Sequence, residues 1–393
     1  MTPGFPAAPP PEPLRITIVA GLHTEARAAT VERLLATVPG SVALHHDLSA
    51  AVRGGTAVRT VRDALGVRDW GEVALADDCA CCALRDGLVA ELRALARART
   101  ARHAVVELWD SVEPRAVAET IARHGGAALT LTPVVTAVDP TRVLSCLGNG
   151  DDLKDARLAA STHDRRTVAD TWARQMEYAD ILSVREDPAV SERDRELLGQ
   201  LHPTARRVPQ DTEDWARVLS GHADPAAAAA AQHPATARLP WNADRRGVGT
   251  LVWRRRRPFH PGRLYEALGA LARAAVRSRG RFWLADRPDA LLSWDAAGGT
   301  LCLENAGPWL AALPETAWDG LTPERRAAAT LDWRRDVGDR CQVLAFTSPA
   351  LDRAALERLL DSCLLTEAEY AAGRAAWKRL PRTFDAFLEP SDR

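Results

Sequence analysis

Three cysteines within four positions are the strongest candidates for chemistry in this chain: Cys79, Cys81 and Cys82. Thiolates bind Zn²⁺ in a tetrahedral geometry, and a loop that carries three of them can supply three of the four ligands. The fourth ligand would be water or one of three candidate side chains: Asp78, His45 and His46. Because the sequence offers no obvious closed set of four ligands, we expect reversible zinc binding at this loop.

Two other interpretations of these cysteines remain open. Free cysteines are often buried and behave as small apolar side chains, although Asp77 and Asp78 beside the triplet argue against a buried segment. Oxidation to a disulfide is the second alternative, and the adjacent pair Cys81 and Cys82 is too cramped to be the favoured bridge. The chain has seven cysteines, an odd number, which favours a reducing compartment and hence the cytoplasm.

Length and composition set further limits on the chain. At 393 residues it exceeds the size at which one core keeps growing, so two domains are expected. The net charge of -1 gives no attraction of the whole molecule to DNA or to a membrane surface. No apolar run approaches the roughly 18 residues of a membrane span. Residues 1–13 are rich in proline and predict a flexible tail, without the pattern of a signal peptide.

Apolar segments alternate with helical patterns over residues 14–220. The candidate strands are 14–21, 41–45, 103–109, 128–138 and 179–184. Continuous apolar strands separated by helices predict a mostly parallel sheet with helices on both faces. The first of these units, with helical spacing at residues 26–36, predicts a strand, a loop and a helix.

A second pattern follows an alanine-rich segment. Residues 221–247 bury little apolar surface and are predicted to be a linker with at most a transient helix. Residues 248–385 mix short strands and helices, with a hairpin signal at Gly298-Gly299. We therefore predict a smaller α+β domain after the linker.

The cysteine segment resembles the CxCC signature of the CobW-type GTPases, a family tied to cobalamin assembly and zinc homeostasis. Further matching motifs lie in order within residues 248–377: Arg257-Pro258-Phe259-His260-Pro261, Gly280-Arg281-Phe282-Trp283-Leu284-Ala285, Asp339-Arg340-Cys341-Gln342 and Cys363-Leu364-Leu365-Thr366-Glu367. The resemblance implies an α/β domain like that of a P-loop GTPase, followed by a CobW C-terminal domain.

The family's phosphate-binding loop is degenerate here. A Walker A motif uses glycines that let backbone amides surround the phosphates, and a Lys-Ser/Thr pair for phosphate and Mg²⁺. In residues 21–28 only the first glycine, Gly21, is retained, Arg27 stands at the lysine position, and Ala28 lacks the magnesium-binding hydroxyl. Arginine is not a conservative replacement for lysine at such a site.

Two further nucleotide motifs of the family are altered. The Glu-x-x-Gly motif reads Glu107-Leu108-Trp109-Asp110, so the glycine that would meet the γ-phosphate is missing. The guanine-binding Asn-Lys-x-Asp motif keeps only Asp187. Because three elements of one site are changed together, we expect no active GTPase, and we do not expect GTP and Mg²⁺ as firm cofactors.

The remaining candidates are given structural roles. His23 and Arg27 are predicted to be solvated loop residues, and Glu107 is predicted to pair with an arginine. His260 is predicted to pack at or cap a helix start. The arginines of residues 254–257 alternate between the faces of a strand, and solvation is favoured for them over contact with ribosomal RNA or an acidic partner.

One branch of the family resembles this chain further: the factors named for recruiting a ribosome-hibernation protein to ribosomes under zinc limitation. The shared features are Val19-Ala20-Gly21, Arg85-Asp86 and the Arg-Pro-Phe-His-Pro stretch. This resemblance implies an adaptor whose partners are a hibernation factor and the ribosome. Two alternatives remain: a GTP-dependent zinc metallochaperone, and a zinc sensor that uses no nucleotide.

Overall fold

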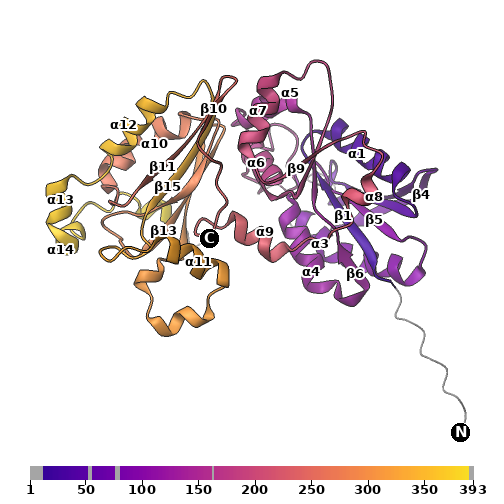
Figure 1. The fold of residues 1–393 in the computed structure, drawn as a ribbon. Helices are drawn as coiled ribbons and strands as arrows, with labels where there is room; N and C mark the ends of the chain where they lie inside the picture. Colours follow the sequence, from indigo (N-terminus) through magenta and orange to yellow (C-terminus); the bar gives the residue numbers. More distant parts are fainter. Residues whose placement is uncertain (1–11, 52–54, 76–79, 162, 389–393) are drawn as a thin grey trace, which may run out of the picture.

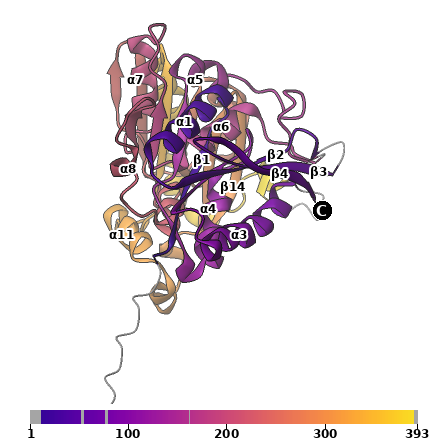
Figure 2. The ribbon, with the colours of Figure 1, turned by 90° about the vertical axis from the view of Figure 1, so that its right-hand side faces the viewer.

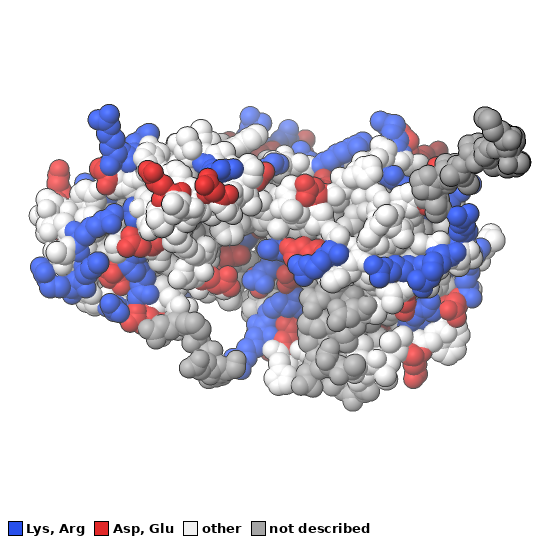
Figure 3. All heavy atoms as spheres, turned by 90° about the horizontal axis from the view of Figure 1, so that it is seen from below, with Lys and Arg blue, Asp and Glu red and all other residues white. Residues whose placement is uncertain are grey.

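Two sheets, each with its own helices, stand side by side in the chain (Figure 1). The computed structural model describes residues 12–51, 55–75, 80–161 and 163–388, with only the backbone for residues 80–86. None of the helices in this part of the chain combines the length and hydropathy that a membrane span requires. Side chains of both charge signs are interspersed on the face shown in Figure 3, in keeping with the net charge near zero.

The first sheet is mostly parallel, as the sequence predicts. Within the described residues it contains nine strands: β1 (Leu14–Ala20), β2 (Ser41–Asp47), β3 (Thr56–Asp63), β4 (Gly66–Ala74), β5 (His103–Glu107), β6 (Leu129–Leu131), β7 (Val135–Val138), β8 (Ile181–Val184) and β9 (Arg206–Pro209). The order is β4-β3-β2-β5-β1-β7-β8-β9, with β6 beside β1. All pairs from β2 to β9 are parallel.

The antiparallel hairpin of β3 and β4 extends this sheet at one edge, and the sequence did not predict it. Its strands are rich in Arg, Thr, Asp and Gly and carry no continuous apolar run. The outer strand β4 is largely exposed, which explains why it lacks the pattern of a buried strand. The predicted segment 128–138 is split into β6 and β7 around Pro133, since proline cannot donate to the ladder.

Helices cover both faces of the first sheet (Figure 2). One face packs against α1 (Thr24–Thr37) and the short α8 (Trp215–Val218). The opposite face packs against a larger group: α3 (Ala80–Ala98), α4 (Pro114–His124), α5 (Pro140–Leu147), α6 (Val168–Tyr178) and α7 (Glu192–Leu201). Alternate strand residues face opposite sides, so Ile18 packs in one core and Val19 in the other.

The second sheet is antiparallel. In the described residues it contains six strands: β10 (Ala243–Arg245), β11 (Val248–Arg255), β12 (Arg277–Phe282), β13 (Ala290–Ala297), β14 (Thr300–Pro308) and β15 (Gln342–Pro349). Its order is β10-β11-β15-β12-β13-β14. The predicted hairpin turn at Gly298-Gly299 is confirmed, and both glycines have the positive φ that such a turn requires.

The two faces of this second sheet differ in polarity. Its apolar face packs against α10 (Pro261–Arg273) and α12 (Arg353–Ser362), around a core that includes Trp253, Phe282 and Phe346. The remaining described elements of this half are α11 (Pro323–Asp332), α13 (Glu367–Ala371), α14 (Gly373–Trp377), α15 (Asp385–Leu388) and two 3₁₀ helices at Leu310–Ala312 and Glu315–Gly320. A further 3₁₀ helix, Gly126–Ala128, belongs to the first domain. The polar face looks toward the first domain.

The alanine-rich segment 221–247 is more ordered than a simple linker. It contains α9 (Pro225–Gln232), which begins at the N-cap Asp224 and lies against α4 and α6, and it ends in β10. In Figure 1, α9 runs between the two domains. The segment thus contains a defined helix, because contacts with α4 and α6 of the first domain stabilise a helix that alanine propensity alone would leave marginal.

Buried ion pairs join the two domains. Glu177 of α6 accepts hydrogen bonds from Arg277 at 2.7 and 2.9 Å and from Arg279 at 3.0 Å, and both arginines belong to β12. Gln200 of α7 donates to the carbonyl of Val248 at 3.1 Å. These contacts fix the domains to each other through charged groups that are largely removed from solvent.

Candidate functional site

The loop between β1 and α1 is short. Only Gly21, Leu22 and His23 separate the two elements, and α1 already begins at Thr24. A Cβ atom on Gly21 would lie 2.6 Å from the carbonyl oxygen of Ala137 on β7, and its φ of 138° is unfavourable for other residues. The first glycine of the motif is thus retained because the chain passes close to a neighbouring strand.

Arg27 is buried in this loop region, with only 2% of its surface exposed. Its Nη1 donates to the carbonyl oxygen of Gly21 at 2.5 Å, and its Nη2 donates to Asp110 Oδ1 at 2.5 Å. Its Nε lies 3.6 Å from Glu107 Oε1 and has no hydrogen-bond partner among the described residues. The prediction that Arg27 is a solvated loop residue is wrong, because two carboxylates from the adjacent strand region hold it inside.

Glu107 lies at the carboxyl end of β5, and its predicted pairing with an arginine is confirmed. Besides Arg27, it accepts a hydrogen bond from Arg62 of β3 at 2.9 Å. Asp110 follows three residues later and also accepts from the hydroxyl of Thr24 at 3.1 Å. Two carboxylates and two guanidiniums therefore form a connected network where parallel strands β1 and β5 end.

His23 is the other loop residue whose predicted solvation is wrong, since only 1% of it is exposed. Its Nδ1 accepts from the backbone N–H of Asp139 at 2.9 Å, so the neutral ring carries its proton on Nε2, which lies 3.4 Å from Cys146 Sγ. The ring also packs on Trp172 with a centroid distance of 4.3 Å. Burial, and to a lesser degree the charge of Arg142, lowers the pKa of His23 to about 3.

A cavity of about 350 Å³ remains beside this loop. Thr24, Asp110, Arg142 and Cys146 are among the residues that line it. A phosphate placed there would face the carboxylate of Asp110, whose nearest cation, Arg27, is already neutralised. The cation at the lysine position of the motif is therefore used inside the protein, and a phosphate in this cavity would meet both the guanidinium of Arg142 and the carboxylate of Asp110.

The other two predicted remnants of a nucleotide site lie apart from the ion-pair network. Ala28 is half-buried on α1 and has no polar side-chain atom. Asp187 follows β8 and accepts from the backbone N–H of Ala189 at 2.8 Å, with Arg185 at 3.5 Å. The carboxylate of Asp187 is thus engaged locally.

The cysteine triplet falls outside what the structure describes. Cys79 is not described, and Cys81 and Cys82 lie in the first turn of α3 with undescribed side chains. The chain enters this segment at Leu75, whose N–H donates to Gly55 at 2.9 Å. Across the described residues, no group of three or more His, Cys, Asp and Glu side chains is arranged for a metal ion. Zinc binding by the cysteines stays a prediction.

The two histidines considered as a fourth ligand differ in which ring nitrogen has a partner. The Nδ1 of His45 lies 3.0 Å from the carbonyl oxygen of Glu107, which can only accept, so Nδ1 carries the proton. The Nε2 atom of the neutral ring then keeps a free lone pair, the arrangement typical of metal-binding histidines. His46 instead points its Nε2 toward Glu91 at 3.6 Å.

The predicted capping role of His260 is confirmed, since its side chain accepts from the N–H of Arg263 at the start of α10. The arginines of residues 254–257 are exposed or partly exposed, in keeping with the predicted solvation, and each also has a protein partner. The partners are Asp332 for Arg254 and Arg256, Asp361 for Arg255 and the ring of Tyr370 for Arg257.

Sequence reasoning missed the role of Asp110 and the contribution of Arg62. The sequence motif marks Asp110 only as the position of a missing glycine. Because β5 lies beside β1 and parallel to it, a carboxylate that follows β5 is well placed to meet Arg27. Arg62 lies on a strand that the sequence did not predict, so no signal pointed to it.

Two family models match the chain. The model described as the CobW/HypB/UreG nucleotide-binding domain matches residues 46–211, and the model of the cobalamin synthesis protein cobW C-terminal domain matches residues 248–364. A zinc chaperone of Mycobacterium tuberculosis is 30% identical over 392 residues, spanning 95% of this chain and 92% of that protein. The chain belongs to the CobW family.

Other comparisons of this CobW-family protein are more distant. The zinc-regulated GTPase metalloprotein activator 1 of Dictyostelium discoideum is 26% identical over 334 residues, covering 78% of this chain and 68% of that protein. The Zn(II)-bound YjiA GTPase of Escherichia coli is 13% identical with a TM-score of 0.37, covering 90% of this chain and 99% of that one. The matched nucleotide-binding model begins after residues 21–28, the segment that Arg27 occupies.

Proposed function

We propose that this CobW-family protein has a zinc-linked role that requires no GTP hydrolysis. The observation that carries the proposal is the position of Arg27, which is buried between the carbonyl of Gly21 and the carboxylates of Asp110 and Glu107. In this arrangement the guanidinium of Arg27 neutralises the protein's own carboxylates, Asp110 and Glu107. It is therefore not free to bind a phosphate group.

The burial of these charges makes nucleotide binding through Arg27 costly. Binding a triphosphate through Arg27 would require the guanidinium to leave Asp110, and breaking a buried ion pair costs about 3–5 kcal/mol. At 1.4 kcal/mol for each tenfold change, this weakens nucleotide binding by roughly 100-fold to 3,000-fold. The repulsion between the freed carboxylates and the phosphates adds to this cost.

Magnesium binding lacks support for a separate reason. Mg²⁺ in nucleotide sites is held by protein oxygen atoms together with phosphate oxygens. Ala28 at the position of the Walker A hydroxyl has no such oxygen. We infer that neither half of the GTP–magnesium pair finds its usual ligands in this chain.

The zinc-linked part of the proposal is supported by the family and by the sequence. One relative is named a zinc chaperone and another a zinc-regulated GTPase. In this chain we assign reversible zinc binding to Cys79, Cys81 and Cys82, with His45 as a candidate fourth ligand through its free Nε2. A group of three thiolates and one imidazole matches the ligands that Zn²⁺ prefers.

The adaptor role is the finer part of the proposal. The resemblance to factors that recruit a ribosome-hibernation protein suggests that this chain joins such a protein to the ribosome when zinc is scarce. The support is the sequence resemblance, together with a phosphate-loop region in which Arg27 is held by Gly21, Asp110 and Glu107, as expected for a protein that does not turn over GTP. A pull-down from zinc-depleted cells is expected to recover the hibernation factor and ribosomal subunits, and recovery of neither contradicts the adaptor role.

Phosphate release from GTP tests the absence of hydrolysis. We expect no release above the protein-free background in the presence of Mg²⁺, with or without Zn²⁺. Zinc-stimulated phosphate release would instead support the alternative, a GTP-dependent zinc metallochaperone. Loss of that release in Arg27→Ala would then assign it to this loop and exclude a contaminating enzyme.

A further inference from the structure

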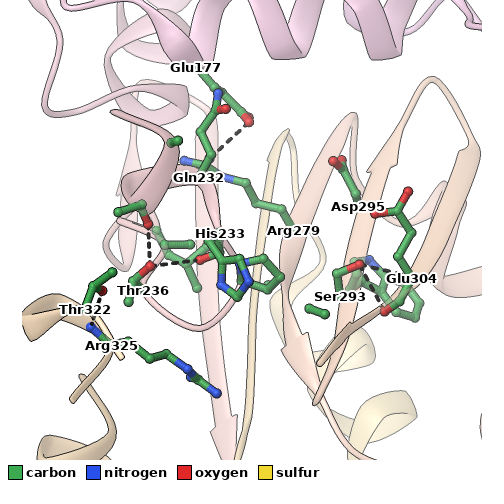
Figure 4. Close-up of a pocket in the computed structure, with 18 of the residues that line it drawn as sticks. Glu177, Gln232, His233, Thr236, Arg279, Ser293, Asp295, Glu304, Thr322 and Arg325 are labelled. Atoms are coloured by element: carbon green, nitrogen blue, oxygen red, sulfur yellow. Dashed lines mark hydrogen bonds and ion pairs between the residues drawn. The ribbon is translucent and has the colours of Figure 1, made fainter. Parts of the chain in front are cut away.

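A large cleft lies between α9 and the polar face of the second sheet (Figure 4). Its volume is about 930 Å³, in the upper part of the range of ligand pockets, roughly 300–1,000 Å³. One wall is the alanine-rich side of α9 and the segment that follows it. The other walls come from β12, β13 and β14, from the start of α11, and from α4 and α6 of the first domain.

The walls of this cleft are fixed by hydrogen bonds from β12. Arg279 donates to the carbonyl of Arg238 at 3.1 Å, and Arg281 donates to the carbonyl of Pro234 at 3.0 Å. These two bonds attach the segment after α9 to the sheet, while Glu177 attaches the sheet to α6. The cleft is therefore preformed and does not depend on closure around a ligand.

One side of the cleft is positively charged. Arg325, in the first turn of α11, donates to the carbonyl of Pro308 at 3.1 Å and has no carboxylate within ion-pair distance among the described residues. Figure 4 shows its side chain and His233 on the same side of the cleft. Partial burial, followed by the charges of Arg325 and Arg115, lowers the pKa of His233.

The opposite side carries negative charge. Glu304 of β14 has no cationic partner among the described residues, and its carboxylate meets only the thiol of Cys302 at 3.6 Å. Asp295 lies beside it on β13 but is already paired with Arg277. In Figure 4, Glu304, Ser293 and Asp295 stand across the cleft from Arg325.

Part of the lining is apolar, while the charged side chains contributed by α4, α6 and β12 are mostly paired with one another. The apolar part is formed by alanines of α9 and by leucines near α11: Ala226, Ala229, Ala230, Leu310, Leu313 and Leu321. Such a surface can bury uncharged groups of a ligand. The unpaired charges of Arg325 and Glu304 would then determine which end of the ligand lies on which side of the cleft. The volume exceeds that of a single free amino acid and suits an extended peptide of several residues.

We propose that this cleft binds a short peptide segment of a partner protein that carries an acidic residue toward Arg325 and a basic residue toward Glu304. Complementary charges supply specificity and orientation, and the apolar lining supplies burial. The site is separate from the loop at Arg27, so this inference stands or falls independently of nucleotide binding.

Fluorescence anisotropy with capped, labelled hexapeptides tests the proposal. Three peptides are compared, all with alanine and leucine in the middle. The charged residues near the two ends are one Glu and one Lys in the first, two Glu in the second and two Lys in the third. The wild-type chain is expected to prefer the Glu–Lys peptide by about fivefold to tenfold, the effect of one charge pair worth roughly 1.4 kcal/mol or somewhat less.

Charge reversal on each side makes the test specific. Arg325→Glu is expected to shift the preference to the Lys–Lys peptide, and Glu304→Arg to the Glu–Glu peptide. Arg217→Glu, on the exposed α8 outside the cleft, is the matched control and should keep the wild-type preference. Binding of none of the peptides at millimolar concentration, or the same preference in all four proteins, overturns the proposal.

Discussion

The Nη2 atom of Arg27 lies 2.5 Å from Oδ1 of Asp110, although the two residues are 83 positions apart in the chain. They meet because β1 and β5 are adjacent and parallel, so the segments after both strands lie at the same edge of the sheet. The pair is shielded from solvent. The guanidinium of Arg27 is neutralised by Asp110 and Glu107 and is therefore not available to a ligand.

Arg27→Ala should lower the free energy of unfolding by about 3–5 kcal/mol, because Asp110 would be left without a counter-ion. Urea denaturation at neutral pH measures this change. Arg33→Ala is the matched control on the same helix, since Arg33 pairs with the exposed Glu213 and its loss should cost less than about 1 kcal/mol. Equal changes in the two variants would contradict a buried network at Arg27.

The buried ring of His23 predicts a loss of stability as pH falls. The folded pKa is about 3 while the unfolded value is 6.5, so between these values only the unfolded chain takes up the proton. Stability should therefore fall by about 1.4 kcal/mol per pH unit for this group as pH drops below 6.5. Urea unfolding of His23→Asn over this range should show a shallower slope. The slope that remains includes the contribution of His103, whose pKa burial lowers to about 4, and of His202 and His233, whose pKa values burial also lowers. An unchanged slope would mean that His23 is hydrated in the folded protein.

Glu177 predicts a second acid-sensitive step at lower pH. Burial alone would raise its pKa, but Arg277 and Arg279 outweigh burial and lower the pKa to about 2 from the ordinary value of 4.5. Its stabilising contribution is complete above pH 4.5 and is lost as pH falls through about 2. Glu177→Gln should remove this dependence below pH 4.5 and leave the His23 step intact. A variant that titrates like the wild type would show that the domains are not joined through this carboxylate.

The cysteine triplet predicts where zinc binds. Replacing Cys79, Cys81 and Cys82 together with serine should weaken zinc binding by more than the roughly 10-fold to 100-fold typical of losing an outer-shell partner. Competition with a chromophoric chelator measures the affinity. Cys302→Ser is the control, since Cys302 is a half-buried free thiol on β14 whose nearest acid is Glu304. An equal loss in the control would point to zinc bound elsewhere.

Local signals in the sequence were sufficient for the first elements of the first domain and for one hairpin turn of the second. The apolar run before Gly21 and the helical spacing after it correspond to β1 and α1, and Gly298-Gly299 marks a real hairpin turn. The hairpin of β3 and β4 was missed because its exposed strands have no apolar alternation to detect.

The burial of Arg27 and His23 could not be predicted from the loop itself. Their partners come from distant segments. Glu107 ends β5 and Asp110 follows it, while Asp139 is the N-cap of α5, Cys146 lies on α5 and Trp172 on α6. A loop that looks solvated by composition becomes buried only when those elements pack over it. The same holds for Glu177, whose partners lie 100 and 102 residues away on β12.

The most direct test is a calorimetric titration of one preparation first with Zn²⁺ and then with GTP in the presence of Mg²⁺. The account predicts saturable zinc binding that is lost in the triple serine variant, and no heat of binding from GTP at millimolar concentration. Saturable, magnesium-dependent GTP binding by the wild-type chain would contradict it, because Arg27 would then have to leave Asp110 and Glu107 for the phosphates.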